Sequence, residues 1–221
     1  MEKIKVLNLY AGIGGNRKLW KNVDVIAVEI NPEIAKIYQD FFPNDKVIVA
    51  DAHQYLLDNY KEFDFIWSSP PCPTHSRLRK VISMNSGAKA VYPDMKLYEE
   101  ILFLEGYFKG KWVVENVISW YNPLIRPYIV ERHYFWANFV LNNKRVYNGK
   151  IELCNGYHQE NDKEQVIRLQ KDFDFDLSKN DLSTMKARTM LRNCVNPKTG
   201  LHIFNMAFKT KQHTLEDIQD A

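Results

Sequence analysis

Short apolar runs alternate with helix-like segments along the first two thirds of the sequence, and this alternation limits the fold more than any other feature. Five runs read as strands, in the order KIKVLNLY, VDVIAVEI, DKVIVAD, FDFIWSS and GKWVVENV, and a sixth, aromatic run is RHYFWANFVL. Residues 32–42 and 93–108 have the apolar spacing of amphipathic helices. Strands that alternate with helices favour a parallel, doubly wound sheet, so an α/β fold is predicted.

Residues with useful chemistry follow the predicted strands at the points where the strands end. Gly12 to Gly15 come after the first strand, and Glu29, Asp51, Cys72 and Glu115 lie at or just after the ends of the next four. In sheets of this type, ligands bind outside the carboxyl ends of the strands. We therefore expect these residues to converge on one edge of the sheet.

The first three features together predict a nucleoside cofactor. The LYAGIGG turn differs from the Gly-x-Gly-x-x-Gly pattern and lacks the Lys-Ser/Thr of a phosphate loop. Glu29 is placed to accept hydrogen bonds from ribose hydroxyls, and Asp51 to receive an adenine amine. A plain turn and two solvated strand ends are the alternatives for each feature alone. Together they favour an adenosine without a pyrophosphate, such as S-adenosylmethionine.

Cys72 stands between prolines in the stretch SSPPCPTHSRLRK. A thiol there is a nucleophile, a zinc ligand, a disulfide partner or a small buried hydrophobe. The three cysteines are widely spaced, which does not indicate disulfides in a chain expected to be cytosolic. His75 would be a second zinc ligand, but nothing nearby completes a metal site. We expect a nucleophile in the positive potential of His75 and of the basic cluster that ends at Lys80.

The next strand end carries a candidate acid. Glu115 follows four apolar residues, so burial should raise its pKa and suit it to donate a proton near neutrality, with Asn116 to orient it. A carboxylate that caps a helix is the alternative. Arg132, at the start of the sixth run, would hold a carbonyl oxygen by its guanidinium fork, or form a surface salt bridge.

Composition narrows the setting. The 221 residues carry a formal charge of +3, and residues 186–198 hold four basic residues and no acid, which is compatible with a nucleic-acid groove or with a solvated face. No run of about 18 apolar residues indicates a membrane span, and the N-terminus has no signal-peptide pattern. We expect a cytoplasmic protein.

The ordered set NLYAGIGG, Glu29, Asp51, PPCPTHS, ENV, an arginine before an aromatic strand, and RNCVNP resembles the cytosine-5 DNA methyltransferases. The resemblance covers nearly the whole chain. It implies a Rossmann-like S-adenosylmethionine-dependent methyltransferase fold, with a mostly parallel doubly wound sheet and a small insert lobe. It divides the chain into a catalytic and cofactor-binding core (1–140), a short target-recognition insert (141–190) and a return segment that completes the cofactor pocket (191–221).

The resemblance also implies roles for individual residues. Cys72 would add to carbon-6 of cytosine, Glu115 would protonate ring nitrogen-3, Arg132 would bind the base carbonyl, and Asn116 would assist. Residues expected at the cofactor are Tyr10, Ala11, Gly12, Ile13, Gly15, Glu29, Ile30, Asp51, Ala52, Pro71, Leu97, Asn193, Cys194 and Val195. Residues expected at DNA phosphates are Ser76, Arg77, Arg79 and Lys80.

The implied partner is duplex DNA with its target cytosine flipped out of the stack. An RNA cytosine-5 methyltransferase and a non-catalytic DNA-binding module are the alternatives. We expect a monomer without metal or membrane contacts, of prokaryotic or phage origin, with a paired restriction enzyme as one possible context. The chain departs from the family at Tyr128 and Val130, which replace a Gln and an Arg, and at Arg192, which replaces a Gly.

Overall fold

The structure is a computed structural model that describes residues 2–77, 80–81, 89–142 and 161–209. Arg79, most of the first part of the predicted insert and the polar tail that begins at Gln212 lie outside these residues. The strands are β1 (Ile4–Leu9), β2 (Val23–Val28), β3 (Lys46–Ile48), β4 (Phe65–Ser68), β5 (Lys111–Val117), β6 (Tyr128–Val130) and β7 (His133–Ala137). The helices are α1 (Pro32–Phe41), α2 (Ala52–Asn59), α4 (Lys96–Tyr107), α5 (Asp162–Phe173), α6 (Thr184–Asn193) and α7 (Pro197–Ala207), with a 3₁₀ turn at Tyr60–Glu62.

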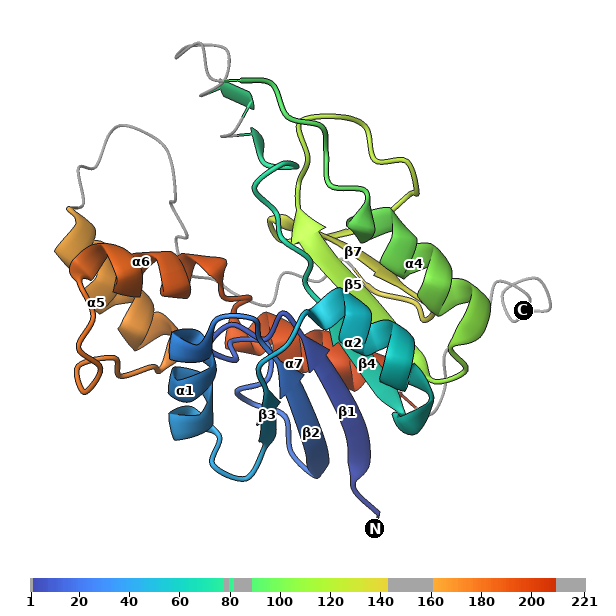
Figure 1. Ribbon diagram of the computed structural model, residues 1–221, viewed down its shortest axis with the longest axis horizontal. Helices are drawn as coiled ribbons and strands as arrows, with labels where there is room; N and C mark the ends of the chain where they lie inside the picture. The colour runs from blue at the N-terminus through green and yellow to red at the C-terminus, as the bar shows by residue number, and fades with distance from the viewer. Residues whose placement is uncertain (1, 78–79, 82–88, 143–160, 210–221) are drawn as a thin grey trace.

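The strands form one seven-stranded sheet in the order β3-β2-β1-β4-β5-β7-β6 (Figure 1). The first five of these strands are parallel to one another, and β7 pairs antiparallel with β5 and with β6. The predicted α/β fold with a mostly parallel sheet is therefore confirmed. The sixth apolar run forms β7, which is shorter than the run, and the sequence pattern did not predict the short strand β6.

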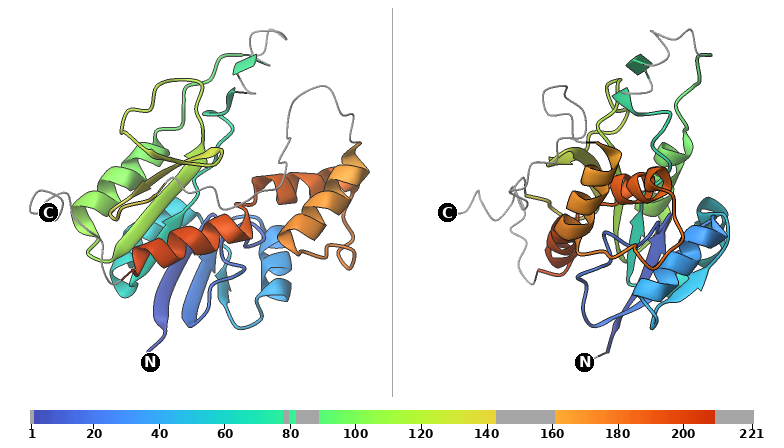
Figure 2. Two further views of the ribbon diagram at one scale, coloured as in Figure 1. Left: turned by 180° about the vertical axis from the view of Figure 1, so that it is seen from behind. Right: turned by 90° about the vertical axis from the view of Figure 1, so that its left-hand side faces the viewer.

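Helices cover both faces of the sheet, as Figures 1 and 2 show. On one face, α7 and Trp20 pack against side chains such as Val6, Phe65 and Phe135. On the other face, α2 and α4 pack against the neighbouring strand positions, such as Leu7 and Ile66. Successive strand residues point to opposite faces, so strands covered on both sides are apolar throughout, as the sequence runs are.

The second part of the predicted insert forms a small helical lobe. Helices α5 and α6 contact each other, and Leu169 and Leu191 belong to a cluster that includes Ile37 of α1 and Ile13. Helix α6 was not predicted, and it runs across the predicted boundary between residues 190 and 191. Because α6 continues almost directly into α7, the lobe is joined to the face of the sheet that α7 covers.

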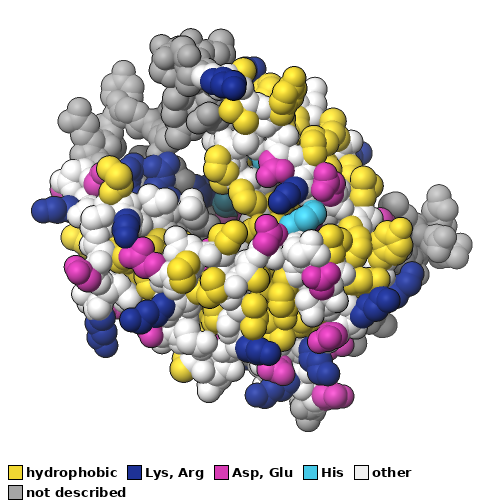
Figure 3. Space-filling view, in the orientation of Figure 1, with side chains coloured by type: hydrophobic (Ala, Val, Ile, Leu, Met, Phe, Trp, Pro, Cys, Tyr) yellow, Lys and Arg dark blue, Asp and Glu magenta, His cyan; other side chains and the backbone are white. Residues whose placement is uncertain are grey.

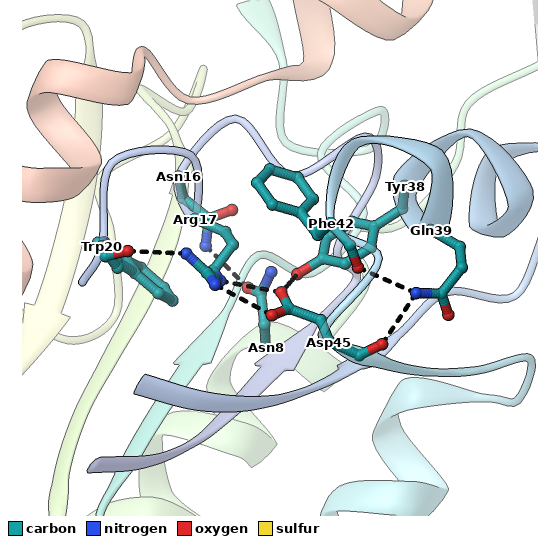
Figure 4. Close-up of polar contacts among 8 residues, drawn as sticks. All are labelled: Asn8, Asn16, Arg17, Trp20, Tyr38, Gln39, Phe42 and Asp45. Atoms are coloured by element: carbon teal, nitrogen blue, oxygen red, sulfur yellow. Dashed lines mark hydrogen bonds and ion pairs between the residues drawn. The ribbon is translucent and has the colours of Figure 1, made fainter. Parts of the chain in front are cut away.

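A buried polar cluster holds the chain between β1 and β2 in place (Figure 4). Two of the guanidinium nitrogens of Arg17, Nε and Nη2, donate to the carboxylate of Asp45, at 2.9 and 3.0 Å. The same carboxylate accepts a hydrogen bond of 2.9 Å from the Tyr38 hydroxyl. Asn16 donates to Asn8, a fully buried residue of β1, at 2.7 Å. The turn after β1 is thereby tied to α1, to the start of β3 and to the sheet itself.

Candidate active site

The carboxyl ends of β1, β2, β4 and β5 lie at the same edge of the sheet, because these strands are parallel. The turn Tyr10–Gly15, Glu29, Cys72 and Glu115 therefore lie along this edge, as the sequence predicted. In Figure 3, Lys and Arg side chains border a hollow between the α5–α6 lobe and the rest of the molecule. The edge thus combines acidic, thiol and basic groups.

The glycine turn is built around the carboxylate of Glu29. Tyr10 and Gly12 both have a φ of +54°, and a side chain at Gly12 would be strained although nothing lies within 4 Å of its would-be Cβ. Oε2 of Glu29 accepts from the Gly12 N–H at 3.0 Å, and Oε1 accepts from the Asn31 N–H at 2.9 Å. Two backbone donors thus fix a buried carboxylate beside open space, an arrangement that suits a ribose.

The segment 193–195 packs against the glycine turn from the other side. A Cβ on Gly15 would lie 2.5 Å from the Val195 carbonyl oxygen and 2.7 Å from the Cβ of Cys194, so only glycine permits this contact. Burial raises the pKa of the Cys194 thiol to about 12, which leaves it protonated and unreactive. Cys194 and Val195 therefore pack behind the turn, whereas the neighbouring Asn193 ends α6 as an exposed residue.

The other residues expected at the cofactor lie around the same end of the sheet. Asp51 caps α2, and the bond that it accepts from the Gln54 N–H lowers its pKa, so it is ionised. Ile30 is 66% exposed directly after Glu29, so it offers an apolar surface beside this carboxylate. Ala11, Ile13, Ala52 and Leu97 are buried, and Pro71 is exposed.

These residues at the strand ends fit S-adenosylmethionine on three observations. The carboxylate of Glu29 is fixed for a ribose, Asp51 is an exposed acceptor for an adenine amine, and the space above Gly12 is open. A pyrophosphate would need the backbone donors of a longer glycine loop, which this turn does not have.

Cys72 follows β4 in a loop that β5 holds. The side chain of Asn116 donates to the Pro70 carbonyl at 2.9 Å, so the loop is fixed two residues before the thiol. Burial raises the pKa of the partly buried Cys72 thiol, the Glu115 carboxylate raises it further, and the positive charge of Arg132 lowers it. The sequence placed the favourable charge on His75 and the cluster after it, but the cation that acts on the thiol is Arg132.

Glu115 is buried within β5, and this burial raises its pKa to about 7, against smaller opposing effects from Ser69 and Arg132. The carboxyl therefore carries a proton for part of the time at neutral pH, which suits a proton donor. Its Oε1 lies 3.7 Å from Nε2 of His133, a residue that sequence analysis did not select.

A further buried carboxylate was not predicted from the sequence. Glu100 of α4 is fully buried and accepts a hydrogen bond of 2.6 Å from the Tyr10 hydroxyl and another from the Ser68 hydroxyl. Nδ1 of His53 lies 3.0 Å from the same carboxylate. Glu100 thus joins the segments that follow β1 and β3 to the last residue of β4. Its spacing of three and four residues from Leu97 and Leu104 places it on the buried helix face, a signal that the sequence contained.

The segment after Cys72 is joined to the chain that leaves β5. Ser76 forms a bridge with Ser119, and Nε of Arg77 donates to the Ser119 carbonyl at 3.3 Å. His75, whose role the sequence left open, is buried and binds the Tyr121 hydroxyl through Nδ1 at 2.6 Å. Burial lowers the pKa of His75, so it is a neutral structural contact.

Lys80 lies over the ring of Trp120. Among residues 2–77, 80–81, 89–142 and 161–209, no group of three His, Cys, Asp or Glu side chains is arranged to hold a metal ion. Over these same residues, no helix has the length and apolar character needed to cross a membrane.

The sheet order and the helices on both faces define a methyltransferase fold. A methyltransferase of Entamoeba histolytica, EhMeth, superposes with a TM-score of 0.61 at 11% identity, covering 96% of this chain and 100% of that one. A DNMT2 variant of Spodoptera frugiperda superposes with a TM-score of 0.56 at 16% identity, covering 94% and 100%. At such identities these likenesses concern the fold.

Residues 4–103 match the family model of the C-5 cytosine-specific DNA methylases, which confirms the predicted resemblance for the motifs within this range. The tRNA (cytosine(38)-C(5))-methyltransferase of Spodoptera frugiperda is 33% identical over 88 residues, which are 37% of this chain and 26% of that enzyme. The match thus spans about a quarter of the curated relative. The family and the fold support S-adenosylmethionine as the cofactor.

Proposed function

We propose that this protein transfers a methyl group to carbon-5 of a cytosine in a nucleic acid, with Cys72 as the nucleophile. The observation that carries the proposal is that Asn116 of β5, next to the buried Glu115, holds the Cys72 loop by its hydrogen bond of 2.9 Å to the Pro70 carbonyl. The charges of Glu115 and Arg132 act on the pKa of the thiol in this arrangement. A nucleophile, a proton donor and a fixed cation are the three groups that activation of a cytosine ring requires.

The residues act on the cytosine in sequence. The Cys72 thiolate forms a bond to carbon-6 while Glu115 donates its proton to nitrogen-3, which turns the ring into an enamine with a nucleophilic carbon-5. The Arg132 guanidinium holds the ring carbonyl. When bound, S-adenosylmethionine supplies an electrophilic methyl group. After methylation, a base removes the proton from carbon-5, and the electron pair of that bond restores the double bond between carbon-5 and carbon-6 and expels the Cys72 thiolate. Nitrogen-3 returns its proton to the Glu115 carboxylate.

The cofactor would lie along the glycine turn. The Glu29 carboxylate would accept from ribose hydroxyls, the Asp51 carboxylate from the adenine amine, and Ile30 would cover a face of the adenine. Gly12 leaves room for close approach, and Gly15, backed by Cys194 and Val195, closes the turn. The target base must leave a stacked or paired state to reach Cys72, at a cost of a few kcal/mol.

For the substrate, we favour RNA over the duplex DNA that the sequence motifs predicted. The observation in favour is that the curated relatives at 28–33% identity are named tRNA (cytosine(38)-C(5))-methyltransferases. The description of the matching family names DNA, so DNA remains the second candidate.

One experiment tests both the methyl transfer and the choice of polymer. Purified protein is incubated with methyl-labelled S-adenosylmethionine and either a tRNA pool or a library of random duplex DNA. Label in RNA supports the proposal, and label in DNA alone would return the substrate to the first expectation. Cys72→Ala should abolish transfer to either polymer while retaining cofactor binding. Transfer that persists in this variant would exclude the covalent route.

A further inference from the structure

A pocket of about 360 Å³ opens beside the Cys72 loop, where this loop meets the chain that leaves β5. It has the size of a small-ligand site, for which the usual range begins at about 300 Å³. The lining residues are Arg77, Lys80, Val81, Ser119, Trp120, Tyr121, Asn122 and Tyr134. None of these described residues is acidic, and two are cations.

The aromatic side chains form a platform in this pocket. Trp120 is 36% exposed, whereas the other four tryptophans of the chain are at most 4% exposed. Its Nε1 donates to the Thr74 carbonyl at 3.1 Å, so the ring is held in a fixed orientation. Nζ of Lys80 lies 4.9 Å from the centre of the ring. An exposed, fixed indole beside cations is a surface on which a nucleobase stacks.

The platform is connected directly to the loop of the proposed nucleophile. The backbone N–H of Trp120 donates to the His75 carbonyl at 3.1 Å, and the Tyr121 hydroxyl binds the ring of His75. The N–H groups of His75 and Ser76 in turn donate to the Cys72 carbonyl, at 3.0 and 3.1 Å. A ligand on Trp120 would therefore contact residues that are hydrogen-bonded to the Cys72 loop. Its binding would affect the position of this loop.

We infer that this pocket binds one unpaired nucleotide of the substrate strand that flanks the target cytosine. Its base stacks on Trp120, its phosphate lies against Arg77 and Lys80, and Asn122 at the rim offers an amide to the base edge. A paired and stacked base has no free face for Trp120, so the site selects substrates that are single-stranded next to the cytosine. The inference rests on the proposed function and adds a substrate feature to it.

Trp120 provides its own binding signal, because the other tryptophans are buried. Single-stranded pentanucleotides with a central cytosine, as RNA and as DNA, are titrated into the protein, with no methyl transfer required. We expect quenching of tryptophan fluorescence, and an abasic substitution at one flanking position should remove most of it. The two sugar types tell which polymer supplies the nucleotide.

Variants separate stacking from charge. Trp120→Ala should weaken binding roughly ten-fold, because base stacking on an aromatic ring has about that effect. Trp120→Phe should keep most of the affinity, measured by anisotropy, and lose the quenching. Lys80→Ala should weaken binding and reduce its salt dependence by about one ion. Lys109→Ala is the matched control, because Lys109 precedes β5 and lies at the opposite edge of the sheet.

The outcomes distinguish the two proposals. If Trp120→Ala and Lys80→Ala bind as the parent and Lys109→Ala do, the pocket is not a nucleotide site, whatever the protein methylates. If binding depends on Trp120 and Lys80 but no methyl group is transferred, the pocket is a nucleotide site and the proposed function fails. Thermal unfolding of Trp120→Ala checks its fold, and Lys80→Ala, which removes no backbone contact, keeps the test decisive if Trp120→Ala is unstable.

Discussion

His133 and Glu115 are diagonal neighbours across the antiparallel pair of β7 and β5, where His133 pairs with Val117 and Glu115 pairs with Phe135, and Nε2 of His133 lies 3.7 Å from Oε1 of Glu115. Burial lowers the pKa of His133 to about 3 and raises that of Glu115 to about 7. Near neutral pH His133 is therefore neutral and Glu115 is protonated for part of the time, so the contact differs from an ordinary ion pair. The neutral imidazole keeps the surroundings of Glu115 free of an additional positive charge, so the carboxyl retains a proton that it can donate.

The stability of the protein should fall as pH rises through the titration of Glu115. The folded state holds the Glu115 proton more tightly than the unfolded state, with a pKa of about 7 against 4.5, so stability is lost between these two pH values. The shift corresponds to about 3 kcal/mol. We expect Glu115→Gln to lose less unfolding free energy than the parent between pH 5 and pH 8, in urea titrations.

The control for this measurement is Glu105→Gln, a substitution at an exposed position of α4. It should follow the parent at both pH values. Equal losses in the parent and in Glu115→Gln would show that Glu115 titrates as an ordinary carboxyl.

The reactivity of Cys72 should respond in opposite directions to its two charged neighbours. The negative charge of Glu115 raises the pKa of the thiol and the positive charge of Arg132 lowers it. Glu115→Gln should therefore shift alkylation of Cys72 by iodoacetamide to lower pH, and Arg132→Met should shift it to higher pH. Peptide mass spectrometry follows Cys72 separately from the other cysteines. Shifts of the same sign in both variants would contradict this arrangement.

The contact between Tyr10 and Glu100 should contribute measurably to stability. A hydrogen bond to a charged group is worth about 1.5–3 kcal/mol, and Tyr10→Phe removes one from a buried carboxylate. We expect a loss of this size in the free energy of unfolding, measured in urea. Tyr107→Phe, at a position that is 64% exposed, is the matched control and should have almost no effect. Similar losses in both variants would argue against a special role for Glu100.

Asp45→Asn should be more damaging, because it leaves the guanidinium of Arg17 without its buried partner. The side chains of Arg17 and Asp45 are 12% and 4% exposed, and loss of one partner of such a pair costs about 3–5 kcal/mol. Thermal and urea unfolding measure the loss. Asp40→Asn, on the exposed face of α1, should remain near the parent. A loss below about 1 kcal/mol in Asp45→Asn would place this ion pair with surface pairs.

The local sequence pattern determined the parallel strands and the chemistry at their ends. An apolar run that is followed by a glycine or an acid indicates where a strand ends. Because the strands are parallel, their carboxyl ends lie together at one edge of the sheet. For this reason Glu29, Cys72 and Glu115 could be assigned to one edge without a structure. The shift of the Glu115 pKa followed as well, because burial in a central strand is a property of the run that contains it.

The tertiary structure alone decided which distant side chains meet this edge. Strand β6 has three residues and is formed through its pairing with β7. Helix α6 does have local signals, the N-cap Ser183 and the buried positions Ala187, Met190 and Leu191, but its place against α5 is set by packing. The partners of Glu100 and the contact of His133 with Glu115 join residues that lie between 18 and 90 positions apart. The Trp120 pocket likewise brings Arg77 and Lys80 beside a ring that lies 43 and 40 positions further along the chain. Contacts over such separations depend on how strands and helices are placed in three dimensions, which the spacing of apolar residues along a single element does not encode.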